Sequence, residues 1–263
     1  MADIENLKKL ANENRKRIID LVYFAKTGHP GGALSIIDVL TAIYELDVDL
    51  NLEKRSKVVL SKGHTVPALY AVLNSKGVVK NEEMKTFRKI NSRLQGHPFT
   101  GTIPEVDATT GLLGQGLSMA VGMAIAKKNI GDNHHVYAIV GDGEMQEGQI
   151  WESLLQAAHY KLNNLILVID YNKLSSYGDV NESMNLEPLT ENTIKNINIL
   201  YEQLKQIRSQ DIAFEKEEST KILKEFSKKY HIAKNTFQDF PEEDQEMLQT
   251  FSYICLLSFD IYM

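Results

Sequence analysis

Cysteine, excess positive charge and long apolar runs are all scarce in this sequence. Its single cysteine, Cys255, excludes an intrachain disulfide and a cysteine-ligated metal cluster. A formal net charge of −6 gives no general attraction to nucleic acid, and we find no local basic patch that would supply one. The densest apolar stretch, residues 251–263, contains Asp260 and is too short to span a bilayer. We therefore expect neither a nucleic-acid partner nor a membrane partner.

The rest of the composition is that of an ordinary globular protein. Hydrophobic residues make up 43% and charged residues 24% of the 263 residues, which is enough for one large domain. The first residues, MADIENLKKLANENRKR, are charged and lack the apolar core of a secretory signal. These features favour a cytoplasmic protein.

Buried strands and helices alternate in the first part of the chain. The apolar patterns predict helices at 3–26, 35–44, 66–75, 116–128 and 149–160, and strands at 57–60, 136–140 and 165–169. Ser35 is the expected N-cap of the second helix. This alternation predicts an α/β fold, a parallel sheet flanked by helices. Ligands of such sheets bind at the carboxyl ends of the strands.

Glycine is confined to the same part of the chain. All 16 glycines lie between Gly28 and Gly178. Units of strand and helix in a parallel sheet use glycine at the C-terminal turns of their helices. Later residues keep helical spacing instead, as Ile194, Ile197 and Tyr201 do. We therefore expect a mostly helical C-terminal segment.

Two polar segments follow consecutive predicted strands. Residues 141–143 read Gly-Asp-Gly, and residues 170–172 read Asp-Tyr-Asn. The Asp142 carboxylate, the Asn172 amide oxygen and the Leu174 carbonyl would form half of an oxygen shell for Mg²⁺ or Ca²⁺. A diphosphate would complete that shell and would also need backbone amide donors. The alternative is purely structural, with Asp142 capping the next helix and Asn172 making a turn.

Three histidines share one kind of loop. His29, His64 and His97 each stand beside glycine or proline, where an exposed imidazole can bind phosphate or move a proton. One such histidine is usually structural, but three in matching contexts indicate a shared pocket. The other histidines lack this context and are interpreted as surface or packing residues: His134, His135, His159 and His231.

A glycine-rich turn precedes the predicted helix at 116–128. In it, Gly111 allows the backbone to approach a flat ligand closely, and Leu112 and Leu113 are apolar groups able to pack on that ligand. A turn of this composition also suits a plain tight connection.

Taken together, these elements resemble the transketolase family, specifically its thiamine-diphosphate-binding N-terminal half. The resemblance covers residues 1–188 and gives the expected domain, followed by a divergent helical tail at 189–263. The segments that carry it are TGHPGG (27–32), LSKGH (60–64), QGHP (95–98), TTGLLGQGLSMAVGMA (109–124), GDGEMQEGQIWE (141–152) and DYNKLSSYG (170–178).

The resemblance implies a role for each matching residue. It implies thiamine diphosphate and Mg²⁺ or Ca²⁺ as cofactors, and two substrate-facing imidazoles, His29 and His97, of which His29 transfers a proton or binds a hydroxyl. It also implies a subunit-interface carboxylate, Glu147. The implied metal ligands are Asp142, Asn172 and the Leu174 carbonyl. The implied cofactor contacts are His64, Gly111, Leu112, Leu113, Gly143 and Asn172.

The resemblance also implies a function and a partner. The length matches the N-terminal subunit of a split transketolase, a transferase of carbohydrate metabolism that moves two-carbon ketol units between sugar phosphates, as in the pentose phosphate reactions. A second subunit would carry the pyrimidine-binding domain, in a homo- or hetero-oligomer. One alternative is an inactive remnant with a regulatory or assembly role. Another is a different thiamine diphosphate class, a deoxyxylulose-phosphate synthase or a 2-oxo-acid dehydrogenase subunit.

Some residues depart from the family pattern. Leu112 replaces the family's usual proline, and residues 175–177 replace a more polar turn. From Leu189 onward, the family's further strands and late histidine are not recognisable. One role for the tail is to cover the free edge of the sheet.

Overall fold

The computed structural model describes residues 4–175, 178–186 and 254–258. Its centre is a four-stranded sheet in the order β1-β2-β3-β6. The first three strands run parallel, and β6 runs antiparallel to β3. The strands are β1 (Lys57–Leu60), β2 (Val136–Gly141), β3 (Leu165–Asp170) and β6 (Ile254–Ser258). The predicted parallel sheet is confirmed.

Successive strand residues pack on opposite faces of the sheet. In β2, Ile139 belongs to the core on one face, and its neighbours Ala138 and Val140 belong to the core on the other. In β3, Val168 belongs to the same core as Ile139, and its neighbours Leu167 and Ile169 belong to the core on the other face. Both faces are therefore buried, which explains why these strands read as continuous apolar runs instead of alternating patterns.

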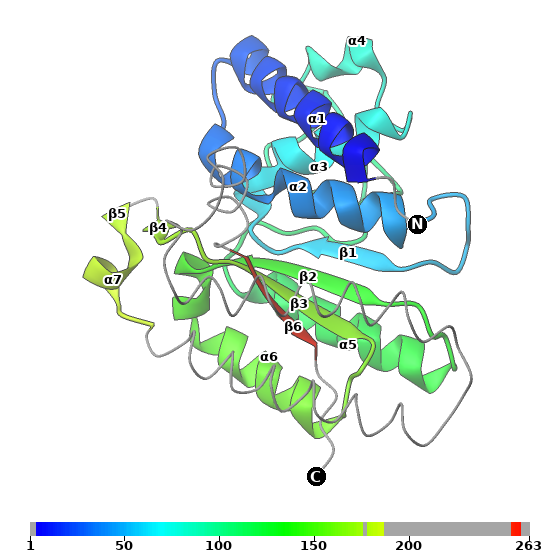
Figure 1. Ribbon diagram of the computed structural model, residues 1–263, viewed down its shortest axis with the longest axis vertical. Helices are drawn as coiled ribbons and strands as arrows, with labels where there is room; N and C mark the ends of the chain where they lie inside the picture. Colours follow the sequence, from blue (N-terminus) through cyan, green and yellow to red (C-terminus); the bar gives the residue numbers. More distant parts are fainter. Residues whose placement is uncertain (1–3, 176–177, 187–253, 259–263) are drawn as a thin grey trace.

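Helices cover the two faces as separate layers (Figure 1). One layer consists of α1 (Ile4–Ala25), α2 (Pro30–Leu46) and α3 (Val66–Ser75), and the other consists of α5 (Gln115–Asn129) and α6 (Gly148–His159). The short elements are α4 (Asn81–Met84), α7 (Val180–Ser183), two 3-10 turns (Gly63–Thr65 and Gly143–Gln146), and a hairpin of β4 (Leu174–Ser175) and β5 (Gly178–Asp179).

One predicted helix start is wrong. The helix expected from Ser35 begins five residues earlier as α2, with Pro30 in its first turn. Proline suits that position because its fixed φ angle is already helical and its missing N–H would have no partner there. Ser35 lies inside the helix and is no N-cap, because its hydroxyl donates to Asp170 Oδ1 at 2.8 Å.

The described piece of the expected helical tail is a strand. Ile254–Ser258 forms β6 and pairs with β3 from Ile166 to Asp170. A strand edge carries unpaired backbone groups that favour such pairing. For these five residues the structure differs from the helical expectation, and the rest of the 189–263 tail lies outside the described residues.

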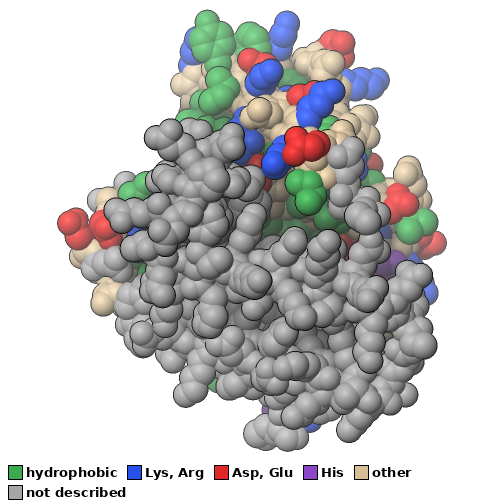
Figure 2. Space-filling view, in the orientation of Figure 1, with side chains coloured by type: hydrophobic (Ala, Val, Ile, Leu, Met, Phe, Trp, Pro, Cys, Tyr) green, Lys and Arg blue, Asp and Glu red, His purple; other side chains and the backbone are tan. Residues whose placement is uncertain are grey.

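Charged side chains of both signs share the surface over the α1 side of the molecule. In Figure 2, Lys and Arg side chains there stand among Asp and Glu side chains. Within the described ranges, no helix has both the length and the apolar character needed to cross a membrane.

Candidate active site

A cavity of about 1030 Å³ opens where β2 and β3 end. Asp142 directly follows β2, and Asn172 stands two residues after β3. The cavity lining contains most of the predicted site residues: His29, His64, Leu113, Asp142, Gly143, Glu147, Asn172 and Leu174. His97, Gly111 and Leu112 are not part of this lining. The structure thus brings residues from several predicted segments to one edge of the sheet.

Asp142 is held rigidly at the end of β2. Its side chain is 2% exposed and accepts backbone N–H bonds from Gly143 at 2.9 Å and from Lys173 at 2.5 Å. Burial raises the pKa of its carboxyl group, while the two N–H bonds oppose that rise. A carboxylate offers about four lone-pair positions, so these two bonds leave room for a cation.

Asn172 makes the turn that is expected if its role is purely structural. Its Oδ1 accepts the Leu174 backbone N–H at 2.9 Å, and its Nδ2 donates to Asp170 Oδ2 at 3.4 Å. The amide oxygen retains a second lone pair. The turn and a ligand role are therefore compatible, and the turn fixes where Asn172 and Leu174 stand relative to Asp142.

Two of the three predicted histidines meet directly. The rings of His29 and His64 stand edge to face, with their centroids 5.4 Å apart. Burial and the Lys62 ammonium lower the pKa of His64 to about 4. His64 is therefore neutral at pH 7 and donates one hydrogen bond at most. His97 also acts on His64 electrostatically.

His97 packs against the glycine-rich turn. A Cβ atom on Gly111 would lie 2.9 Å from His97 Cδ2, and Gly111 has a φ of +145°, which L side chains rarely adopt. A Cβ atom on Gly63, the neighbour of His64, would lie 2.9 Å from the Gly111 nitrogen. Glycine at 111 and 63 therefore lets the loops of His64 and His97 approach each other. Leu112 in this turn is 69% exposed.

The sequence patterns missed a buried carboxylate in the cavity lining. Glu144 is 2% exposed and accepts bonds from the Ser61 hydroxyl at 2.5 Å and the Gly114 N–H at 2.8 Å. It also accepts the Gly141 N–H at 3.3 Å, and burial raises its pKa. Glu144 thus ties the ends of β1 and β2 to the start of α5.

A buried ion pair was also missed. Lys62 follows β1 and pairs with Asp170, the last residue of β3, and both side chains are almost fully buried. Asp170 also accepts hydrogen bonds from Ser35 and Asn172. The available signal was a charged residue at the end of an otherwise apolar strand, which requires a partner when buried.

Residues 6–212 match the family model described as the thiamine diphosphate binding domain of transketolase. The match covers more than half of the chain. The chain belongs to the transketolase family. The matched range extends past residue 188, where we placed the domain boundary, and that boundary stays a prediction.

Several curated relatives are named as transketolase subunits. The chain is 43% identical over 194 residues to an apulose-4-phosphate transketolase subunit of Phocaeicola vulgatus, covering 72% of this chain and 68% of the relative. It is 40% identical over 191 residues to 6-deoxy-6-sulfo-D-fructose transketolase subunit SqwG of a Clostridium species, covering 71% and 70%. The expected resemblance to the N-terminal subunit of a split transketolase is confirmed.

Solved transketolases share this fold. The Leishmania mexicana enzyme aligns with a TM-score of 0.67 at 31% identity over 70% of this chain and 30% of its own. The Campylobacter jejuni enzyme aligns with a TM-score of 0.66 at 36% identity over 70% and 31%. The chain thus spans less than a third of the length of these enzymes, which belong to a family of transferases.

Proposed function

We propose that the chain is the thiamine-diphosphate-binding subunit of a split transketolase. With a second subunit that carries the pyrimidine-binding domain, it would transfer two-carbon ketol units between sugar phosphates. The observation that carries this proposal is the convergence of Asp142, Asn172 and His64 on one cavity at the strand ends. The names of the subunit relatives support the split arrangement.

The residues around the cavity suit a diphosphate and a divalent cation. Asp142 and Asn172 retain free lone pairs on hard oxygen atoms, the ligand type that Mg²⁺ and Ca²⁺ prefer. The first turn of α2 also lines the cavity, and His29 makes no side-chain cap there. The backbone N–H groups in the first turn of α2 have no partner within the helix, and such groups favour an anion. Asp142, Asn172 and the Leu174 carbonyl would hold the metal, and His64 and the Gly143 N–H would contact the diphosphate.

The other predicted residues would serve the substrate and the partner. His29 would bind a substrate hydroxyl or move its proton, and His97 would face the same substrate. Gly111, Leu112 and Leu113 would lie against the cofactor rings, and Glu147 would join the contact between subunits. When bound, thiamine diphosphate supplies a carbon nucleophile and an electron sink. The protein contributes orientation, charge and proton transfer.

The names of the subunit relatives indicate a class of substrate. One relative is named for apulose-4-phosphate and another for 6-deoxy-6-sulfo-D-fructose. Both compounds are sugar derivatives with an anionic group, so we propose a substrate of that class and favour sugar phosphates.

The test is reconstitution with a partner. The chain would be co-expressed with a candidate pyrimidine-domain subunit from the same genome and assayed for ketol transfer with thiamine diphosphate and Mg²⁺ over a panel of phosphorylated and sulfonated sugars. We expect no activity from the chain alone and activity from the complex. Calorimetry that detects no Mg²⁺-dependent binding of thiamine diphosphate, even with the partner present, would overturn the proposal.

A further inference from the structure

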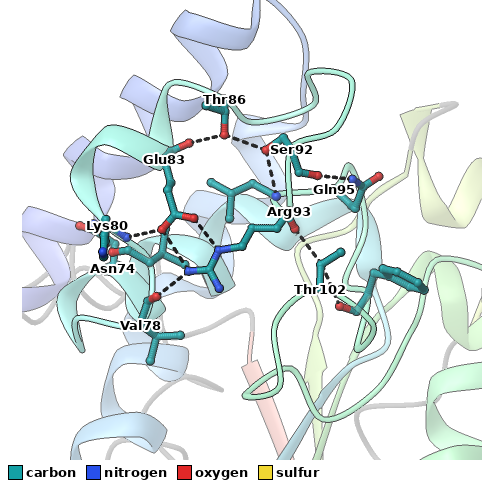
Figure 3. Close-up of polar contacts among 12 residues, drawn as sticks. Asn74, Val78, Lys80, Glu83, Thr86, Ser92, Arg93, Gln95 and Thr102 are labelled. Carbon is teal, nitrogen blue, oxygen red and sulfur yellow. Dashed lines mark hydrogen bonds and ion pairs between the residues drawn. The ribbon is translucent and has the colours of Figure 1, made fainter.

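The loop that carries His97 is held by side-chain bonds. In the segment between α4 and α5, Arg93 donates two bonds to Glu83 of α4, at 2.5 and 3.0 Å, and one to the Val78 carbonyl at 2.8 Å (Figure 3). The Thr102 hydroxyl donates to the Arg93 carbonyl at 2.9 Å. These bonds hold the segment before and after His97 to α4 and to the end of the α3 layer.

Arg88 contacts both the loop of His29 and the loop of His97. Its Nη1 donates to the Thr27 hydroxyl at 2.9 Å, two residues before His29. Its Nε lies 3.0 Å from where a Cβ atom of Gly96 would stand, directly before His97. One guanidinium thus touches both histidine loops, and the glycine at 96 makes room for it.

The position of Arg88 is maintained despite two unfavourable features. Its backbone has a φ of +60°, uncommon for a residue other than glycine, and its N–H donates to the Leu94 carbonyl at 2.9 Å. Its Nε is buried without a hydrogen-bond partner among the described residues. A strained backbone and an unsatisfied buried donor both cost free energy, so they persist only where the surrounding structure holds them. Such features cluster at functional sites.

We propose that Arg88 is a positioning residue that joins the loops of His29 and His97 and holds the two imidazoles in register with each other. This inference rests on the proposed function, in which both imidazoles meet the substrate. Arg88 itself is not part of the cavity lining, so it acts through the two histidines.

The positive charge of Arg88 also affects the protonation of His97. Burial lowers the pKa of His97, and the Arg88 guanidinium and His29 lower it further. His97 also helps to lower the pKa of His64, and the backbone at Gly111 packs against the His97 ring. Because arginine is always protonated, its charge acts with burial to favour the neutral His97 imidazole, a form in which one ring nitrogen can accept a hydrogen bond from a substrate hydroxyl.

The test compares three variants by the pKa of His97. Arg88→Met removes the charge and the Thr27 bond, Arg88→Lys keeps only the charge, and Arg93→Met is the control for a purely structural loss. NMR titration of the seven histidine rings in the full chain gives the pKa, with His97→Gln identifying the signal. We expect Arg88→Met to raise the pKa of His97 toward its ordinary value, and Arg88→Lys and Arg93→Met to leave it low.

Kinetics of the reconstituted complex provide the second measurement. In Arg88→Met, the acid limb of kcat/KM should move to higher pH, and kcat/KM should fall about tenfold or more as the imidazoles lose their alignment. Arg88→Lys should reduce kcat/KM with the acid limb in place. If Arg88→Met folds and leaves the His97 pKa unchanged, or if Arg88→Lys restores full activity, the proposal is wrong.

The two proposals can fail separately. If the wild-type complex has no ketol transfer activity, the proposed function fails, and the NMR titrations still decide whether Arg88 controls His97. If Arg88→Met does not fold, a His97 pKa that rises in Arg88→Lys to the ordinary value contradicts the proposal, and one that stays low supports it.

Discussion

Asp142 is the residue on which the predicted metal site most depends. Its two backbone bonds fix the carboxylate at the end of β2 without using all its lone pairs. Asp142→Ala should weaken Mg²⁺-dependent binding of thiamine diphosphate by more than about a hundredfold, since outer-shell changes alone cost up to that much. Isothermal calorimetry of the reconstituted complex measures this. Asp20→Ala, an exposed aspartate on α1, is the control and should bind as wild type does. Equal affinity in Asp142→Ala would remove Asp142 from the metal site.

Gly111 and Gly122 form a matched pair of glycines. A methyl group on Gly111 would meet the His97 ring and sit on a backbone with a φ of +145°, whereas one on Gly122 in α5 would meet nothing within 4 Å. Gly111→Ala should therefore lower the free energy of unfolding by about 1–3 kcal/mol. Gly122→Ala should raise it by about 0.5–1 kcal/mol, because alanine loses less entropy in a helix. Urea unfolding measures both changes, and a Gly111→Ala variant as stable as wild type would show that the turn tolerates a side chain.

The Glu83–Arg93 pair connects α4 to the loop of His97. Hydrogen bonding from Arg93 lowers the pKa of Glu83 from 4.5 to about 2, so the pair stabilises the folded state above pH 4.5 and ceases to do so as the pH falls toward 2. Glu83→Gln should lower the free energy of unfolding by about 1 kcal/mol at pH 7. The difference from wild type should shrink between pH 4.5 and 2. Urea titrations across this range test it, with Glu82→Gln as the exposed neighbour that should change little. A constant difference at all pH values would contradict the assignment.

The sequence predicts regular elements well where local pattern and tertiary burial agree. The strand expected at 136–140 is β2 with one more residue, because a continuous apolar run is typical of a strand buried on both faces. The start of α2 was missed because serine is a favoured N-cap residue, so no local pattern indicated that Ser35 lies inside the helix. There its hydroxyl donates to Asp170. Local patterns cannot separate a capping hydroxyl from one that contacts a distant strand.

The candidate site was predictable only in part. His29, His64 and Asp142 could be found from their loops, since strand ends share one edge of a parallel sheet. The Lys62–Asp170 pair joins residues 108 positions apart, and its partners follow from the strand order, which sequence spacing does not reveal. The same holds for Arg88, whose contacts lie in two different loops.

The predicted site residues all lie in the first 174 of the 263 residues. All of them precede Gly178, the last glycine, and eight of the eleven line the cavity at one edge of the sheet. The chain spans about 30% of the length of the solved Leishmania transketolase. Leu113 lines the cavity and is 43% exposed, and its neighbour Leu112 is 69% exposed, which suits the proposed contact with a second subunit.

Cofactor binding should be visible in the thermal stability of the whole molecule. A ligand that binds only the folded state adds about 2.7 kcal/mol at one hundred times its dissociation constant, and each kcal/mol raises Tm by about 2–4 °C in a chain of this size. Thiamine diphosphate with Mg²⁺ should therefore raise the Tm of the reconstituted complex by about 5–10 °C. The rise should disappear with a chelator or in Asp142→Ala, because the diphosphate then lacks the cation that compensates its charge. Differential scanning calorimetry measures all three. An equal rise without metal would overturn the metal site, and no rise with metal and partner present would overturn cofactor binding.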